Sequence, residues 1–192
     1  MRKLRSVLAA LPVLMLSACF SLVSAPPSKL PLLHLSPQAF GSNLSLSQRL
    51  TLVAANNAKV QELGAAHSLD SLLEINAQEV RMAGFAIGRR ILTLSWDGQS
   101  LNASQDRLLP WRADPERILR DIQLAFWPYA SIVAALPKGW TLVEDEASRT
   151  LQQDGVVKMH IRYSGSPRWQ GTSTMDNRAE GYLLKIESSA QE

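Results

Sequence analysis

Apolar and polar residues alternate along several short stretches of the chain, which is the pattern of half-buried β-strands. The first stretch has leucine at positions 44, 46, 50 and 52, and the polar residue Gln48 interrupts its apolar face. Residues 90–96 alternate in the same way and end at Asp97-Gly98, a pair typical of hairpin turns. Further strands are predicted at residues 59–66, 71–76, 140–144, 149–152, 156–163 and 182–186. Residues 165–181 are predicted to form a long polar loop, which leaves open a short strand within it.

A helical pattern interrupts these strands in the middle of the chain. Asp114 and Pro115 indicate a helix start, because a carboxylate caps free amides and proline loses no hydrogen bond at the first position. Apolar residues follow at helical spacing as far as Phe126. Pro128 interrupts the helix, and a second short helix ends before Pro137. Helices inserted into an antiparallel sheet predict the α+β class.

The first residues of the chain have the pattern of a bacterial lipoprotein signal. Residues 1–5 are basic and residues 7–16 are apolar, a run shorter than the ~20 residues that a membrane span needs. The run ends in Leu16-Ser17-Ala18-Cys19, which resembles a lipobox. The resemblance implies that Cys19 becomes an N-acyl S-diacylglycerol cysteine. The alternative is an ordinary secretory signal in which Cys19 is incidental.

We therefore predict three parts: a signal peptide at residues 1–18, a lipidated cysteine and tether at 19–39, and one domain at 40–192. The tether prediction rests on prolines at positions 26, 27, 31 and 37, which interrupt helices and sheets alike. Leucines at positions 30, 32, 33 and 35 leave open that part of the tether lies against the domain.

Charge and cysteine content exclude several classes of protein. The chain has 20 basic and 17 acidic residues, and removal of the signal peptide, with Arg2, Lys3 and Arg5, leaves equal numbers of each. A neutral chain lacks the positive field of nucleic-acid binding proteins, so no nucleic-acid partner is expected. A single cysteine excludes an internal disulfide and a multi-cysteine zinc site.

The sequence contains no recognisable catalytic motif. It has no nucleophile elbow, phosphate-binding loop, dinucleotide fingerprint or paired-histidine zinc motif. His34, His67 and His160 are widely separated. We therefore expect no enzyme activity, no metal site and no cofactor.

Several segments together resemble an uncharacterised family of bacterial lipoproteins, a domain of unknown function. The likeness extends over residues 44–188. It rests on residues 118–124, Phe126-Trp127-Pro128, Gly139-Trp140, residues 161–163, Asn177 and residues 181–186.

The order of elements is also similar, more distantly, to the lipoprotein-localisation proteins LolA and LolB. This resemblance implies a curved antiparallel half-barrel, with two short helices as a lid over an apolar cavity for acyl chains. The residues expected to line such a cavity are Leu92, Leu94, Trp96, Ile122, Phe126, Trp127, Met159, Ile161, Tyr163, Tyr182 and Leu184. For each tryptophan, ordinary core packing is the alternative.

The resemblance to LolB also implies a protruding loop that contacts membrane or acyl cargo. Phe85 and Ile87 lie where that loop would be, with Ile87 at its tip. The alternative is a buried strand end followed by a turn. An exposed aliphatic residue forgoes burial energy of about 1.5–3 kcal/mol, which indicates use in binding.

These observations predict a monomeric lipoprotein anchored in the outer membrane through Cys19 and facing the periplasm. Its expected role is to bind a lipid or acyl chain in lipid or lipoprotein transfer, or in envelope-lipid export. Its expected partners are membrane lipid, an acyl-chain or lipoprotein cargo, and a periplasmic carrier protein. The alternative is a non-catalytic accessory or assembly subunit of an envelope complex, with a filled core.

Overall fold

The computed structural model describes residues 29–54, 67–107, 109 and 114–191. Within them, ten strands pair antiparallel in one sheet of order β5-β4-β3-β2-β1-β10-β9-β8-β7-β6. The strands are β1 (Leu44–Ala54), β2 (His67–Ile75), β3 (Val80–Ala86), β4 (Arg89–Trp96), β5 (Leu101–Gln105), β6 (Trp140–Glu144), β7 (Ser148–Gln153), β8 (Val156–Tyr163), β9 (Gly171–Asn177) and β10 (Tyr182–Ala190). The helices are the 3₁₀ helix η1 (Pro37–Phe40), α2 (Pro115–Phe126) and α3 (Tyr129–Ala135).

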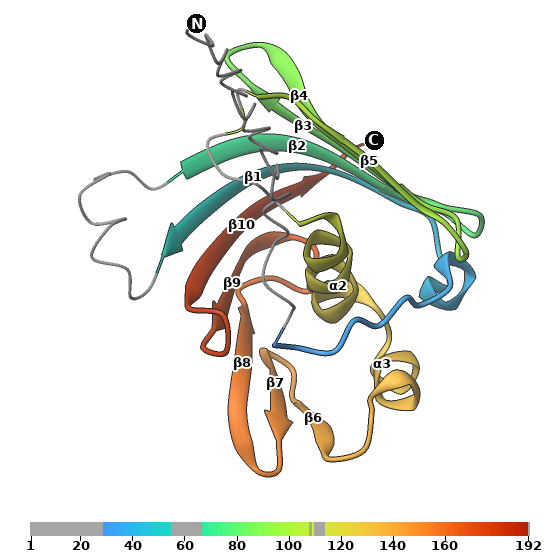
Figure 1. Ribbon diagram of the computed structural model, residues 1–192, viewed down its shortest axis with the longest axis vertical. Helices are drawn as coiled ribbons and strands as arrows, with labels where there is room; N and C mark the ends of the chain where they lie inside the picture. Colours follow the sequence, from blue (N-terminus) through green and yellow to red (C-terminus); the bar gives the residue numbers. More distant parts are fainter. Residues whose placement is uncertain (1–28, 55–66, 108, 110–113, 192) are drawn as a thin grey trace, which may run out of the picture.

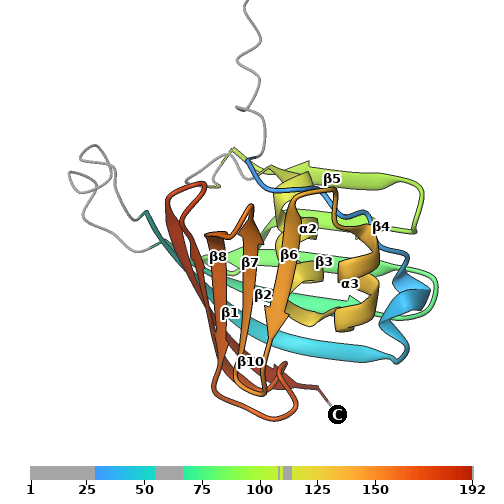
Figure 2. The same cartoon turned by 90° about the horizontal axis from the view of Figure 1, so that it is seen from below.

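The sheet is strongly curved and is not closed into a barrel, so β5 and β6 are its edges. Figure 1 shows one wing formed by β1–β5 and another formed by β6–β10, with α2 in the space between them. The view in Figure 2 places both helices between the two wings. The prediction of an antiparallel sheet combined with two short helices is confirmed.

Most of the strands follow the alternation seen in the sequence. The strands expected at residues 44–52, 90–96, 140–144, 149–152, 156–163 and 182–186 are confirmed as β1, β4, β6, β7, β8 and β10. The strand expected at 71–76 is the second part of a longer β2. The strand expected at 59–66 lies outside the described residues.

β3 was not predicted, although its buried face contains Val80 and Met82. β5 and β9 carry little apolar signal: β5 was not predicted, and for β9 only a short strand within a polar loop was left open. β5 is polar and almost wholly exposed, so no alternation marks it. β9 lies within the segment expected to be a polar loop. Its inward side chains include Ser173 and Asn177, which are buried beside Met175. Polar residues on the buried face remove the contrast on which the prediction depends.

The two helices begin and end where the sequence indicates. Asp114 caps α2, because its Oδ1 accepts the amide hydrogen of Glu116 at 3.0 Å. Pro115 takes the first helical position, where no amide donor is needed. The helix ends at Phe126, and Pro128 then caps the start of α3. The predicted break at Pro128 is confirmed.

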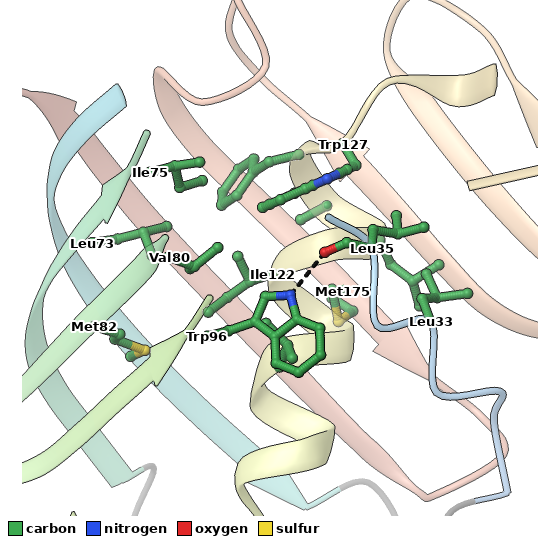
Figure 3. Packing of buried hydrophobic residues seen from close by; sticks show 14 of the residues in the cluster. Leu33, Leu35, Leu73, Ile75, Val80, Met82, Trp96, Ile122, Trp127 and Met175 are labelled. Carbon is green, nitrogen blue, oxygen red and sulfur yellow. Dashed lines mark hydrogen bonds between the residues drawn. The ribbon is translucent and has the colours of Figure 1, made fainter. Parts of the chain in front are cut away.

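Aromatic rings fill one half of the space between the sheet and α2. Trp127 is fully buried, and its ring centroid lies 5.2 Å from that of Phe40. Trp96 is buried beside Val80 and Leu73, as Figure 3 shows. We call this region, at the end of the sheet that holds η1 and the C-terminus of α2, the packed half.

The chain from residue 29 to 40 belongs to this core, which differs from the predicted tether of residues 19–39. Leu30, Leu33 and Leu35 are buried, and the segment crosses the open side of the sheet next to α2 (Figure 1). The indole of Trp96 donates a hydrogen bond to the carbonyl of Leu35 at 2.8 Å (Figure 3). The indole of Trp127 donates to the carbonyl of Ser36 at 3.1 Å. The prolines prevent regular structure here, while the leucines still supply burial energy.

A buried arginine closes the packed half. The guanidinium of Arg149 donates to the carbonyls of Leu124 at 2.8 Å and Trp127 at 2.7 Å, and to the carboxylate of Glu144 at 2.6 Å. It therefore satisfies carbonyls at the C-terminus of α2 that have no partner inside the helix.

Candidate functional site: an apolar cavity under helix α2

The other half of the space between sheet and helix is hollow. A cavity of about 280 Å³ lies between the concave face of the sheet and α2, close to the lower limit of typical ligand sites. We call this region the hollow half. Its walls are formed by Gln48, Leu50, Leu52, His67, Leu69, Met82, Leu92, Leu109, Asp114, Arg117, Ile118, Asp121, Ile122, Phe126, Tyr182, Leu184 and Ile186.

The apolar lining follows from the periodicities of the elements around it. Leu50 and Leu52 are alternate residues of β1, so both face the concave side of the sheet. On α2, Ile118, Ile122 and Phe126 are four residues apart and share one helix face. A strand face and a helix face thus enclose the same space.

The mouth of the cavity is polar. We give this name to the end of the cavity where β1 ends and β2 begins, and its lining there, which we call the rim, includes His67, Asp114 and Arg117. Nε of Arg117 lies 3.4 Å from a carboxylate oxygen of Asp114. An amphiphile could therefore place its chain inside and its charged group at this rim.

A buried ionic network holds the mouth end of α2 in place. The guanidinium of Arg120 forms two hydrogen bonds with the carboxylate of Glu180, at 3.1 and 2.9 Å, in the turn between β9 and β10. Its Nε donates to Asp121 at 2.9 Å, and Asp121 also accepts a short hydrogen bond from the hydroxyl of Tyr182. The main-chain amide of Lys29 donates to Glu180 at 3.0 Å, so the entering chain is held here too.

Burial and charge shift the proton affinities of this network. Burial raises the pKa of Asp121, although the charge of Arg120 opposes that change. Burial and the nearby Asp121 carboxylate raise the pKa of Tyr182. Burial alone would lower the pKa of Arg120, but Asp121 and Glu180 raise it instead. Arg120 is thus charged and Tyr182 is a hydrogen-bond donor at neutral pH.

The structure divides the residues that were expected to line a cavity into two groups. Leu92, Ile122, Phe126, Tyr182 and Leu184 line the hollow half. The others are buried in the core without lining this cavity, and these are Leu94, Trp96, Trp127, Met159, Ile161 and Tyr163.

Most of the network and the rest of the lining were not identified from the sequence. Arg120 and Glu180 are far apart in the chain, and nothing in the sequence pairs them. Ile118 could have been found, because it precedes Ile122 and Phe126 at the same helical spacing. The sequence shows that Gln48 interrupts an apolar strand face, but its position in a cavity wall depends on the fold.

The turn between β3 and β4 forms an exposed apolar tip. Ile87 is 98% exposed, while Phe85 and Ala86 before it are half-buried. Ile87 and Gly88 have φ of 51° and 69°, the positive values of a type I′ hairpin turn. The register pairs Asp70 with Phe85, which places Ile87 at the same end of the sheet as His67 and the cavity mouth.

Acidic and tryptophan side chains outside the cavity make structural contacts. Among the described residues, no group of three or more His, Cys, Asp or Glu is placed to hold a metal ion. Glu144 binds Arg149 and Arg168. Trp140 and Trp169 are partly buried against the core. Cys19 and Trp111 lie outside the described residues, and no described helix has the length and apolar character of a membrane span.

The fold and the cavity define a protein with one large curved antiparallel sheet that encloses an apolar site under a helix. The chain belongs to a family of proteins of unknown function, DUF3261, which it matches over residues 45–190. No curated protein matches the chain.

Proposed function

We propose that this protein is an outer-membrane lipoprotein that binds an acyl chain in the hollow half and acts in lipid or lipoprotein transfer, or in envelope-lipid export. The observation that carries this proposal is the apolar cavity of about 280 Å³ beneath α2. Protein interiors are otherwise closely packed, and an unfilled apolar space favours a ligand. The open, curved sheet also agrees with a LolA- or LolB-like half-barrel.

The tip at Ile87 supports contact with a membrane or with cargo. A β-branched residue is poorly suited to positive φ, where Asn, Asp and Gly are favoured. The hairpin between β7 and β8 has Asp154 and Gly155, with φ of 48° and 78°, in the corresponding positions. The β7–β8 turn thus has a suitable polar residue, Asp154, at the position of positive φ. The β3–β4 turn, beside the cavity mouth, has the exposed Ile87 at the corresponding position.

The position of Lys29 agrees with a lipid anchor at Cys19. Lys29 is fixed at the mouth end of the domain by its hydrogen bond to Glu180. The ten or so residues back to Cys19 could extend about 33 Å. An anchor at Cys19 would therefore leave the cavity mouth and Ile87 within reach of the same membrane. Loss of membrane association in Cys19→Ser tests the anchor.

Binding of a fluorescent fatty-acid probe to the purified protein tests the cavity function. The wild type should bind the probe, and Ile122→Trp should weaken binding at least tenfold, because the larger ring occupies the cavity. Val133→Trp is the matched control, since Val133 lies on α3 and is 41% exposed. Absence of binding to the wild type, or equal binding to Ile122→Trp, would overturn the proposal. We propose no catalytic role.

An accessory subunit of an envelope complex is the second candidate. It is favoured by exposed apolar residues on α3 and β6, where Tyr129, Val133 and Val143 are 43%, 41% and 53% exposed. Surface residues of this kind are typical of protein contacts. A wild type that does not bind the probe, but loses a complex when Val133 is changed to Asp, would support this candidate.

A further inference from the structure

A polar row crosses three neighbouring strands next to the inner end of the cavity, and one of its members, Gln48, lines the cavity. Gln48 lies directly opposite Ser188 of β10 on one side and Ser71 of β2 on the other. We call these three residues the polar row. On each strand the adjacent inward residue toward the mouth is apolar and lines the cavity, and these residues are Leu50, Leu69 and Ile186.

Gln48 and Ser71 of the polar row are buried and Ser188 is half-buried, and the row is incompletely hydrogen-bonded. Gln48 is 7% exposed, and its amide nitrogen donates to the hydroxyl of Ser188 at 2.9 Å. Ser71 is 3% exposed, and its hydroxyl has no hydrogen-bond partner in the described part of the chain. An unsatisfied buried hydroxyl lowers stability, whereas alanine or valine would fit a strand without that cost. A serine at this position therefore points to a partner outside the described chain.

The surroundings of the polar row limit the chemistry of that partner. Gly84 is the residue opposite Ser71 on β3, and the apolar side chains of Leu69 and Leu92 occupy the space over that glycine, so no polar side chain of β3 faces the hydroxyl. The polar row contains amide and hydroxyl groups but no charge. The rim charges of Asp114 and Arg117 belong to the mouth, at the other end of the cavity. An ionised group at the inner end would lose its hydration without a counter-charge, but a neutral oxygen would not.

We propose that the ligand is an acyl chain with a neutral oxygen group, such as a hydroxyl, at the end that reaches the polar row. This inference rests on the proposed function, because it assigns a ligand class to the same cavity. Gln48, which lines the cavity and is oriented by Ser188, supplies both donor and acceptor capacity for such a group. The unsatisfied hydroxyl of Ser71 lies on the next strand, directly opposite Gln48. The apolar walls hold the chain, and the polar rim takes its charged end.

Displacement of the fluorescent fatty-acid probe by matched pairs of fatty acids tests the inference. Each pair consists of a fatty acid and its ω-hydroxy form of equal chain length. An apolar cavity would discriminate against the hydroxyl, but the wild type should bind the two members of the best-fitting pair within about threefold. Gln48→Leu should weaken the binding of only the hydroxy acid, by about tenfold or more. Leu50→Met, in the same cavity wall, should affect both members equally.

Ser71→Ala provides a second, independent measurement. It should raise the melting temperature of the ligand-free protein by a few degrees, since it removes an unsatisfied buried hydroxyl. The same substitution should also weaken binding of the ω-hydroxy fatty acid relative to binding of the unsubstituted fatty acid. The inference would be overturned if the ratio of the two affinities, for the fatty acid and for its ω-hydroxy form, were equal in the wild type, Gln48→Leu and Ser71→Ala. That outcome would leave acyl binding intact. Failure of the wild type to bind the probe or either acid would instead refute the proposed function.

Discussion

The packed half and the hollow half are built from the same elements but are filled differently. β1 contributes Leu46 to the packed half, where it is fully buried, and Leu50 to the wall of the cavity. α2 likewise extends along both. In the packed half, the rings of Trp96 and Trp127 and the segment of residues 29–40 occupy the space. The hollow half has no equivalent filling.

The apolar walls of the hollow half are Leu, Ile, Met and Phe side chains, so the contrast shows that the cavity depends on a frame that holds these walls apart and not on small residues. An apolar space tends to shrink when its walls can move, which lowers the cost of leaving it empty. Each half has one buried arginine at α2, Arg149 in the packed half and Arg120 in the hollow half. Arg149 binds helix carbonyls, whereas Arg120 connects α2 to Glu180 and Tyr182. The second network holds the helix at a fixed distance from the sheet.

Removal of residues 29–40 should have the largest effect, because it empties part of the packed half. A chain that begins at Gly41 should lose on the order of 5 kcal/mol of stability, from the burial of three leucines at about 1.5–3 kcal/mol each. A chain that begins at Lys29 keeps these contacts and is the control. Chemical denaturation of both checks the prediction, and equal midpoints would show that the segment does not stabilise the domain.

Truncation of one side chain in each half should separate the two regions. Trp127→Ala should cost about 3–5 kcal/mol, since the ring is fully buried and its loss leaves a cavity. Leu184→Ala should cost less than about 2 kcal/mol, because that side chain is only half-buried and already borders an empty space. Equal losses in urea denaturation would mean that the halves are packed alike.

The sequence predicted most strands whose buried face is apolar, but not β3, although its buried face contains Val80 and Met82. Strands with a polar buried face gave a weaker signal still. Leu92, Leu94 and Trp96 alternate and are all buried in β4. In β9, Ser173 and Asn177 face inward, so hydrophobicity gives no signal there. The prolines of residues 29–40 predicted a tether, but the leucines between them left open the packing that the structure shows for Leu30, Leu33 and Leu35, because packing does not require a helix or strand.

The cavity could be predicted only in part for a related reason. Apolar periodicity indicates which residues face inward, and it identified Ile122 and Leu184 as well as Trp127 and Met159. It does not say which inward residues meet an opposing side chain. That depends on tertiary distances, such as those fixed by Arg120 and Glu180, residues that are paired only after folding.

Alkaline pH should weaken the packed half through Tyr163. Burial raises the pKa of Tyr163 to about 12 from the ordinary 10.0, and its hydroxyl donates to the carbonyl of Ala125 at 2.8 Å. The folded state therefore binds the proton more tightly than the unfolded state. This contribution is complete below pH 10 and disappears as the pH rises to 12, a loss of about 2–3 kcal/mol.

Tyr163→Phe should remove that part of the pH dependence. At pH 8 the variant should lose only about 1 kcal/mol, the value of one hydrogen bond. Between pH 10 and 12 its stability should fall less steeply than that of the wild type, although the raised pKa of Tyr182 leaves a contribution from the hollow half. Denaturation curves at several pH values measure both slopes, and identical slopes would contradict the assignment to Tyr163.

The smallest expected change in stability concerns Ile87, at the mouth of the hollow half. This change is an increase, whereas the preceding variants lower stability. Ile87→Asn should raise stability by about 1 kcal/mol, because asparagine tolerates the positive φ that isoleucine does not. If the tip contacts membrane, the same variant should bind liposomes more weakly. Leu72→Asn is the control, since Leu72 is exposed on the opposite face of the sheet. A more stable Ile87→Asn with undiminished liposome co-sedimentation would separate the strained turn from any membrane role. A more stable variant with reduced co-sedimentation would show that the hollow half retains an unfavourable residue at its mouth for binding.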